Sequence, residues 1–251
     1  YTALYDVYDT ANDKPFLLPL NQLLGFIGAH EWHKKGIDIP QLNGKIHVPF
    51  GVFSPLRGEY LDLIAQAPLA PNIQTAFDIG TGSGVIAAIL AKRGISNIIA
   101  TDTNPKAIAC ATANLKRLGL NKAVNIQSID LFPKSCADLI VCNPPWLPAK
   151  PTSAIETALY DPNNAMLTAF LNGVRHHLNP NGEAWLIISD LAEHLHLRDK
   201  DFLNQCFQTA SLNVVDILKT KPQHKKAIDE SDPLAFARNK ETTYLYRLKT
   251  I

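Results

Sequence analysis

The chain has 251 residues, of which 46% are hydrophobic and 19% are charged. A chain of this length and composition can bury a substantial core, as one domain or as one domain with an appendage. The net charge of only +1 excludes a general electrostatic attraction to nucleic acid, although it still permits a local basic patch.

The four cysteines show no Cys-x-x-Cys spacing, and three of them lie in apolar or helical segments. This pattern favours free, buried thiols in a reducing cytosol, so we expect a cytoplasmic protein. No segment approaches the roughly 20 consecutive apolar residues of a membrane span, and none resembles a signal peptide, so we expect no membrane partner.

Residues 1–70 differ from the rest of the chain in the spacing of their apolar residues and in their proline and glycine content. The apolar spacing predicts a short amphipathic helix that starts near Pro19 and a second helix from Gly58 to Ala67. Between these helices lies a passage punctuated by proline and glycine. We interpret residues 1–70 as an N-terminal lid or substrate-recognition extension, followed by one larger domain of residues 71–251.

From residue 75 onward, short apolar runs alternate with segments of helical periodicity. Strands are predicted at residues 75–79, 97–101, 124–129, 139–142, 184–189, 212–219 and 242–248. Helices are predicted at residues 85–92, 105–118, 164–178 and 192–210. Such alternation calls for a parallel sheet covered on both faces. We therefore predict an α/β fold: a doubly wound, Rossmann-like sheet of seven strands, mostly parallel, with an antiparallel last strand.

Acidic side chains and glycines gather where the first three predicted strands end. Asp78 and the turn Gly80-Thr81-Gly82-Ser83-Gly84 let the backbone approach a ligand closely at the first switch-point loop. Asp102 follows this turn at roughly the 20-residue offset at which an acidic side chain meets ribose hydroxyls. Asp130, at the end of the third strand, is placed to meet an adenine amino group. The pattern predicts a nucleoside-binding edge of the sheet.

The fourth predicted strand, opened by Asp138, ends in Asn143-Pro144-Pro145-Trp146. Two consecutive prolines cannot donate ladder hydrogen bonds, so the strand must stop there. The Asn143 side-chain oxygen and the Pro144 carbonyl can each accept one hydrogen of a planar NH2 group, while the Trp146 ring stacks on it. Two acceptors outside the plane of the nitrogen favour a pyramidal nitrogen, and hence the transition state for its attack on an electrophile.

These segments together resemble a class I S-adenosylmethionine-dependent methyltransferase, and the resemblance covers residues 75–190. It implies S-adenosylmethionine as the cofactor, with the glycine turn facing its methionine part, Asp102 holding its ribose, and Asp130 and Leu131 bordering its adenine. The implied cofactor-binding residues are Asp78, Gly80, Thr81, Gly82, Ser83, Gly84, Asp102, Thr103, Asn104, Asp130, Leu131 and Asn143. The implied catalytic residues, which present the target nitrogen, are Asn143, Pro144, Pro145 and Trp146.

More narrowly, the Asn-Pro-Pro-aromatic signature resembles enzymes that methylate amino groups. These are the protein-glutamine N5 methyltransferases of peptide release factors and the adenine N6 and guanine N2 enzymes that act on nucleic acid. The glutamine enzymes look closest, because Phe53–Glu59 and Tyr160-Asp161-Pro162 match segments that they carry before the core and after the tetrapeptide. Two departures are the loss of their glycine-rich stretch at residues 163–166 and Trp146 in place of their usual tyrosine.

The resemblance therefore implies methyl transfer to a protein glutamine, for instance in a translation factor. The alternative substrate is a base, adenine N6 or guanine N2, in structured ribosomal or transfer RNA. A basic cluster between the last two strands is a candidate phosphate contact, although a solvated loop explains it more simply. This cluster comprises Lys219, Lys221, His224, Lys225 and Lys226.

Two other classes of protein share part of the pattern. A nicotinamide-dependent dehydrogenase would share the glycine turn and Asp102, but its Gly-x-Gly-x-x-Gly pattern requires a small residue at Val85 and leaves the tetrapeptide unexplained. A non-catalytic methyltransferase-like subunit need not retain the tetrapeptide, which this chain has. We expect no metal, because methyl transfer from a sulfonium needs none and no carboxylate or cysteine cluster completes a site around His30 and His33.

Overall fold

The computed structural model describes residues 3–4, 7, 17–55, 58–149, 160–222 and 234–251. Within these residues, seven strands form one sheet and two short strands form a separate hairpin. The strands are β1 Ile37–Ile39, β2 Gly44–Ile46, β3 Thr75–Ile79, β4 Asn97–Asp102, β5 Val124–Ser128, β6 Ala137–Cys142, β7 Leu178–Ser189, β8 Leu212–Thr220 and β9 Thr243–Thr250. The helices are α2 Leu20–Lys35, α3 Glu59–Gln66, α4 Val85–Lys92, α5 Pro105–Arg117, α6 Ala165–Val174, α7 Leu191–His194, α8 Phe202–Thr209 and α9 Ala235–Arg238.

The seven-stranded sheet, in the order β5-β4-β3-β6-β7-β9-β8, confirms the predicted fold. Strands β3 to β7 run parallel, whereas β9, the last strand of the chain, is antiparallel to both β7 and β8. The chain moves outward from β3 through β4 to β5 and then returns to place β6 on the other side of β3. This reversal creates the switch point at which such sheets bind ligands. Because Ile79 pairs with both Thr101 and Cys142, the segments after these residues leave the sheet at one level.

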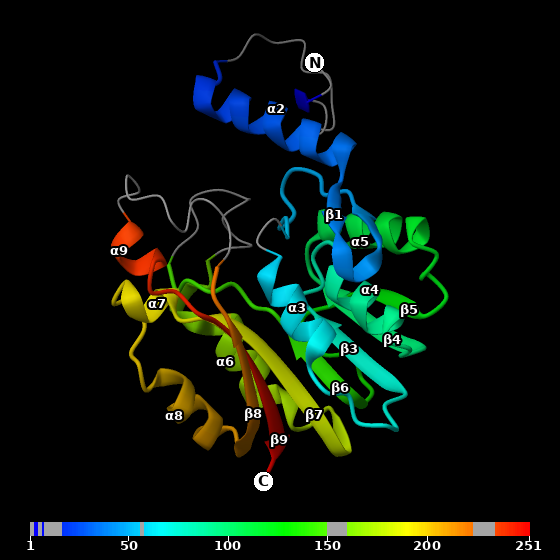
Figure 1. Ribbon diagram of the computed structural model, residues 1–251, viewed down its shortest axis with the longest axis vertical. Coiled ribbons are helices and arrows are strands. Elements are labelled where there is room, and N and C mark those ends of the chain that lie inside the picture. The colour runs from blue at the N-terminus through cyan, green and yellow to red at the C-terminus, as the bar shows by residue number, and fades with distance from the viewer. Residues whose placement is uncertain (1–2, 5–6, 8–16, 56–57, 150–159, 223–233) are drawn as a thin grey trace.

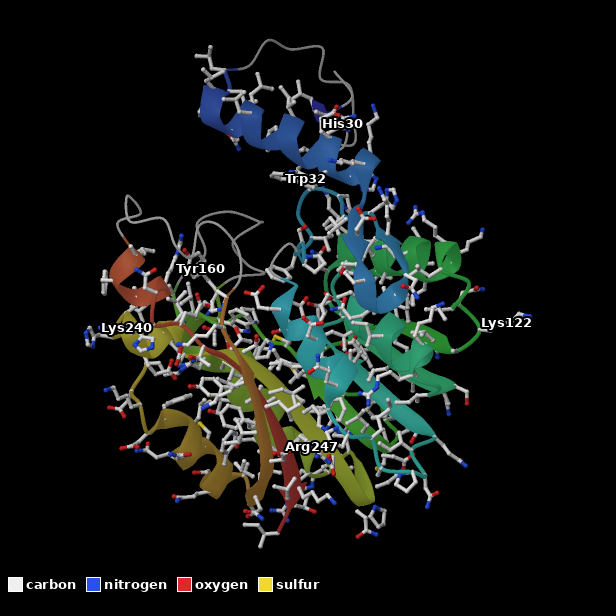
Figure 2. The ribbon with its side chains drawn as sticks, in the orientation of Figure 1. His30, Trp32, Lys122, Tyr160, Lys240 and Arg247 are labelled. Carbon is white, nitrogen blue, oxygen red and sulfur yellow. The ribbon has the colours of Figure 1, made fainter. Side chains whose placement is uncertain are left out.

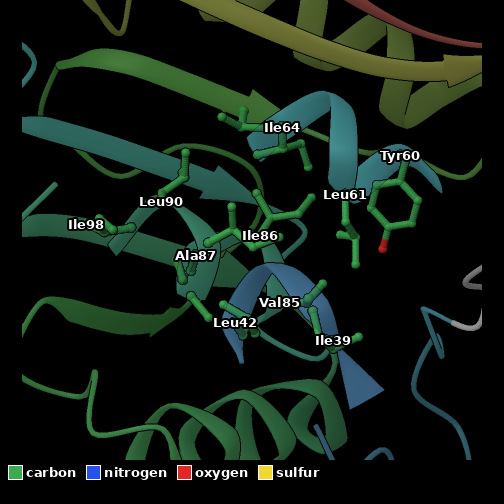
Figure 3. Close-up of a cluster of buried hydrophobic side chains, with 14 of the residues drawn as sticks. Ile39, Leu42, Tyr60, Leu61, Ile64, Val85, Ile86, Ala87, Leu90 and Ile98 are labelled. Atoms are coloured by element: carbon green, nitrogen blue, oxygen red, sulfur yellow. The ribbon is translucent and has the colours of Figure 1, made fainter. Parts of the chain in front are cut away.

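Helices cover both faces of the sheet (Figure 1). Residues of a strand point alternately to the two faces, so that Ala76 joins the core beneath α3, α4 and α5, whereas Phe77 joins the core beneath α6 and α8. The segment with the β1-β2 hairpin adds Ile39 and Leu42 to the first core, where Figure 3 shows them beside residues of α4. The domain boundary expected at residue 70 stays a prediction.

Helix α2 lies apart from the sheet, at the opposite end of the molecule from the C-terminus (Figure 1). It runs for 16 residues and is therefore longer than predicted. Its apolar side chains are spread around the helix, since Leu20 and Leu24 are exposed while Phe26 is buried edge-on against Phe50, with ring centroids 4.7 Å apart. The prediction of an amphipathic helix is wrong here, because no single apolar face is directed at the core.

Two other predicted helices are longer than the observed ones. The helix predicted at residues 164–178 ends at Val174, because the chain there turns into β7, which pairs with β6. The helix predicted at residues 192–210 is divided into α7 and α8. In the segment between them, His196 has a left-handed φ of 57°, and the Arg198 side chain is buried in the protein. A residue in the left-handed conformation cannot continue a right-handed α-helix, so the helix is interrupted there.

Asp138, at the start of β6, joins three strands at the amino-terminal end of the sheet. Its carboxylate accepts hydrogen bonds from the N–H groups of Gln74 and Thr75 at 3.0 and 2.9 Å, from the Thr75 hydroxyl at 2.8 Å and from Asn179 Nδ2 at 2.8 Å. Burial by itself would raise the pKa of Asp138, but these hydrogen bonds outweigh it and lower the pKa to about 2. The ionised carboxylate therefore stabilises the folded chain.

We expect Asp138→Asn to lower the free energy of unfolding at pH 7 by about 1 kcal/mol, after allowance for solvent screening of this partly exposed group. Because the folded-state pKa is lowered, the stabilisation is complete above the ordinary carboxyl pKa of about 4. It is lost as the pH falls through about 2. Urea unfolding of both proteins across this range measures the effect, and a difference that does not shrink in acid would contradict the assignment.

Candidate active site at the carboxyl edge of the sheet

The turn after β3 has a backbone shape that glycine adopts most readily. Gly80, Gly82 and Gly84 have φ angles of 70°, 55° and 80°. A side chain at Gly80 would also meet Met166, whose Cε lies 2.8 Å from the position that a Cβ would take. The Gly84 N–H closes the turn by donating to the Thr81 carbonyl at 2.9 Å, and α4 follows. Such a turn allows a ligand to approach the main chain closely.

Asp78 lies completely buried next to this turn. Its Oδ2 accepts from the Thr81 hydroxyl at 2.7 Å and from the Ala87 N–H at 3.0 Å, whereas Oδ1 has no hydrogen-bond partner among the described residues. Burial raises the pKa of Asp78 to about 6, against the effect of the two hydrogen bonds and with a further contribution from the charge of Asp102. A buried acceptor without a partner is costly, so this site suits a cationic N–H donor.

Asp102 holds the glycine turn and the turn after β4 together. Its Oδ2 accepts from the Gly82 N–H at 2.9 Å, and its Oδ1 accepts from the Asn104 N–H at 2.8 Å. Asn104 in turn caps α5 by accepting from the Lys106 N–H at 2.9 Å, and its Nδ2 donates to the Gly51 carbonyl at 3.1 Å. Each carboxylate oxygen of Asp102 can accept a second hydrogen, so hydroxyl groups of a ligand can still bind there.

Two predicted cofactor-binding residues follow β5 and differ in their exposure to solvent. Asp130 is exposed, whereas Leu131 is partly buried and has an unusual positive φ of 49°. The Leu131 carbonyl accepts from the Thr101 hydroxyl at 2.7 Å, which ties this loop to the end of β4. Thr103 is exposed beside the same edge, and Ser83 is buried behind the glycine turn. The predicted cofactor residues therefore follow three neighbouring strands, while their roles stay predictions.

Asn143 follows β6 next to the glycine turn. Its Oδ1 accepts a hydrogen bond from the Trp146 indole N–H at 2.9 Å. The sequence predicts that this oxygen accepts from a target nitrogen, and the structure adds that the indole already occupies one of its two acceptor positions. The Trp146 ring stands edge-on to Tyr60, with centroids 6.5 Å apart and an interplanar angle of 86°. Pro144 is buried, whereas Pro145 is partly exposed.

Nothing in the sequence pattern marks Tyr60 as part of this edge. The residue is only 2% exposed and comes from α3, which packs onto the sheet from far away in the chain. Burial raises the pKa of its phenol well above the ordinary value, and the charges of Asp78 and Glu59 raise it further. Tyr60 is therefore neutral, contacts Trp146 and lies near enough to Asp78 to respond to its charge.

Asp161 and Arg198 hold the segment that follows the tetrapeptide. The Asp161 N–H donates to the Leu147 carbonyl at 2.8 Å, and its carboxylate accepts from two N–H groups in the first turn of α6 at 2.9 and 3.0 Å. Arg198 Nη1 lies 3.4 Å from the Trp146 carbonyl. Asp161 could have been identified from the sequence, because an Asp-Pro pair before a helical pattern is a helix-capping signal. Arg198 carries no such signal, since it lies in a segment that is predicted to be helical.

Other predicted features lie away from this edge or outside the described residues. Lys219 and Lys221 are exposed, and the other members of the basic cluster, residues 224–226, lie outside the described residues. Residues 56–57 of the segment before α3 also lie outside them. Cys110 and Cys142 are buried and all four cysteines are free, although Cys136 is exposed, contrary to the expectation of buried thiols.

Two kinds of feature are absent from the described part of the chain. No group of three or more His, Cys, Asp or Glu side chains there is arranged to hold a metal ion, and His33 instead stands edge-on to His47, with ring centroids 6.2 Å apart. None of the helices in those same stretches has the length and apolar content that crossing a membrane requires.

The sequence pattern of the methyltransferase small domain family matches residues 44–217. The chain belongs to this family. The match begins in β2 and ends in β8, so it includes α3, the glycine turn and the tetrapeptide. The methyltransferase resemblance predicted from the strand-end residues is thereby confirmed at the level of the family.

Two individual relatives each match about half of the chain. It is 34% identical over 139 residues to the release factor glutamine methyltransferase of Cereibacter sphaeroides, a match that covers 50% of each chain. It is 30% identical over 133 residues to the tRNA1(Val) (adenine(37)-N6)-methyltransferase of Cytophaga hutchinsonii, covering 50% of this chain and 56% of the relative. The chain thus spans about half the length of these curated relatives.

Solved structures support the methyltransferase fold. A methyltransferase from Pyrococcus furiosus superposes with a TM-score of 0.52 at 18% identity, covering 80% of this chain and 91% of that one. At this level of identity the likeness concerns the fold alone.

We expect the Asp78→Asn variant of the ligand-free protein to gain stability over the wild type at pH 7.5, compared with the difference between the two proteins at pH 4. Because burial raises the folded-state pKa of Asp78 to about 6, its contribution to stability is complete below the ordinary carboxyl pKa of about 4 and is lost as the pH rises through about 6. An asparagine carries no charge and escapes this loss. Thermal melts across the pH range measure the effect, with Asp201→Asn as an exposed control. A Tm difference between wild type and Asp78→Asn that is constant with pH would contradict the buried charge.

Proposed function

We propose that this protein is an S-adenosylmethionine-dependent N-methyltransferase that transfers a methyl group to a planar amide or amino nitrogen. The observation that carries the proposal is the register of β3 with β4 and β6, which places the glycine turn, Asp102 and Asn143 at one edge of the sheet. Membership of the methyltransferase small domain family supports it independently.

The residues at this edge fit S-adenosylmethionine. The unpartnered Oδ1 of Asp78, next to the glycine turn, suits the ammonium group of the methionine part. The remaining acceptor positions of Asp102 suit the ribose hydroxyls. We assign the cofactor to Asp78, Gly80, Thr81, Gly82, Ser83, Gly84, Asp102, Thr103, Asn104, Asp130, Leu131 and Asn143.

S-adenosylmethionine supplies, when bound, a methyl group on a positively charged sulfur that is already a good electrophile. The task of the chain is therefore to align the target nitrogen and to exclude water. The Asn143 oxygen and the Pro144 carbonyl accept the two hydrogens of the target NH2 group, which favours a pyramidal nitrogen with an available lone pair. Pro145 keeps this backbone rigid, and Trp146 orients Asn143 through its indole N–H.

We propose a protein glutamine, for instance in a translation factor, as the substrate. Several relatives are named release factor glutamine methyltransferases. The sequence segments at residues 53–59 and 160–162 also resemble those of that class of enzyme. The second candidate is a base in transfer or ribosomal RNA, favoured by the similarity to a tRNA adenine methyltransferase. Free thiols and the soluble substrates of either class favour action in the cytoplasm.

Radiolabelled methyl transfer distinguishes these substrates. Purified protein and labelled S-adenosylmethionine are added to a fractionated lysate of cells that lack it, and the labelled fraction is digested with protease or with ribonuclease. We expect the label to be released by protease. Release by ribonuclease would replace the glutamine by an RNA base, and no transfer to either class would contradict the proposed activity.

Two substitutions separate alignment of the nitrogen from binding of the cofactor. We expect Asn143→Ala to lower kcat by about 100-fold or more while much of the affinity for S-adenosylmethionine remains, with a Kd that rises by less than about tenfold. We expect Asp102→Ala to raise that Kd by more than about tenfold, because it removes the ribose acceptor and releases the Gly82 N–H. Turnover assays and calorimetry measure the two effects, with NADH titrated beside S-adenosylmethionine. Near-normal turnover of Asn143→Ala would contradict its assigned role.

A further inference from the structure

Arg198 is a cation buried behind the tetrapeptide segment, with a side chain that is only 1% exposed. Its Nε and Nη2 donate to the two carboxylate oxygens of Glu193 at 2.9 and 3.2 Å. Its Nη2 also donates to the Ser189 carbonyl, at the end of β7, at 2.9 Å. These three contacts join α7 and β7 and fix the plane of the guanidinium group.

The remaining edge of the guanidinium faces the tetrapeptide. Nη1 lies 3.4 Å from the Trp146 carbonyl and 3.4 Å from Asn164 Oδ1, distances at which each contact is weak by itself. Trp146 is nevertheless held at three points, because its indole N–H donates to Asn143 and its ring stands against Tyr60. The main-chain end of Trp146 thus depends on a group that is itself locked in place.

Stability alone is a poor explanation for a buried cation at this place. Taking an ion pair out of water costs about as much as its attraction returns, and apolar residues of the same volume often stabilise a fold equally well or better. A guanidinium offers five N–H donors in a rigid fork and so can hold several oxygen atoms in fixed relative positions. At Arg198 these oxygens belong to β7, α7 and the tetrapeptide segment.

We propose that Arg198, locked by Glu193, is a positioning residue that fixes the Trp146 carbonyl and, through the indole, the direction of the Asn143 oxygen. The inference rests on the proposed function, in which that oxygen faces the target nitrogen. The contacts of Arg198 reach Ser189, Glu193, Trp146 and Asn164 and not the glycine turn or Asp102. Its loss therefore affects alignment of the substrate and leaves the glycine turn and Asp102 in place.

The first test compares turnover with cofactor binding in Arg198→Met, which keeps an apolar chain of similar length. We expect kcat to fall about 10- to 100-fold, the scale on which a small misplacement slows a reaction, and the Kd for S-adenosylmethionine to stay within about twofold. Arg198→Lys should recover part of kcat, because an ammonium keeps the charge beside Glu193 but lacks the planar fork.

Arg247→Met provides a matched control. Arg247 forms the same bidentate pair with Glu183, at 3.0 and 2.9 Å, and its side chain is 14% exposed. Figure 2 shows Arg247 toward the other end of the sheet from Tyr160, which pairs with Leu147 next to the tetrapeptide. We expect this variant to lose thermal stability while kcat stays within about twofold. An equal loss of kcat in Arg198→Met and Arg247→Met would show that Arg198 has only a structural role, and it would overturn the proposal.

The second test reads the position of Trp146 directly. The chain has three tryptophans, so a proton–nitrogen correlation spectrum resolves few indole signals, and Trp146→Phe assigns one of them. We expect Arg198→Met to shift the Trp146 indole signal and Arg247→Met to leave it unchanged, with exposed Trp32 as a reference. An unmoved Trp146 signal in Arg198→Met would overturn the proposal.

Both tests remain decisive under two complications. If Arg198→Met does not fold, Arg198→Lys and Glu193→Gln take its place, with a smaller expected fall in kcat and the same expected shift of the Trp146 indole signal. If the wild-type protein transfers no methyl group to any amide or amino substrate, the proposed function fails, whereas the indole signal still decides whether Arg198 positions Trp146.

Discussion

The pairing of β3 with β4 on one side and with β6 on the other is the constraint on which the rest of the molecule depends. Because Ile79 lies level with Thr101 and Cys142, the glycine turn, Asp102 and Asn143 start from the same level of the sheet. This level is set by evenly spaced main-chain hydrogen bonds of parallel strands and by buried apolar side chains on both faces. The arrangement of polar groups at the edge is therefore a property of the scaffold.

Most of the sheet can be predicted from sequence because its strands and helices carry strong local signals. Asn104 and Pro105 begin α5 where the capping pattern places it. The later helices are predicted too long, because helical propensity contains no information on a strand partner or on a buried charge such as Arg198. The β1-β2 hairpin escapes prediction for another reason: strands of three residues give too little periodic signal.

The same distinction applies to the site. Asp78, Asp102 and Asn143 can be found because polar residues that end apolar runs are visible in the sequence. Tyr60 and Arg198 cannot, since they reach the edge through long-range packing of α3 and of the segment after α7. The orientation of the tryptophan is also beyond sequence reasoning: the residue type suggests a stacking surface, while the bond from its indole to Asn143 depends on the shape of the loop.

The hydrogen bond from the Trp146 indole limits how many further hydrogens Asn143 can accept at this edge of the sheet. A carbonyl oxygen has two lone pairs, and Trp146 engages one of those on Asn143 Oδ1. Asn143 Oδ1 therefore has one acceptor position left for a hydrogen of an NH2 group, and the Pro144 carbonyl can accept the other hydrogen. A nitrogen that has exchanged one hydrogen for carbon fills only one of these places and is also bulkier. On the proposed mechanism, this edge of the sheet therefore holds a singly methylated nitrogen less well than an NH2 group. The product is then released before a second methyl transfer.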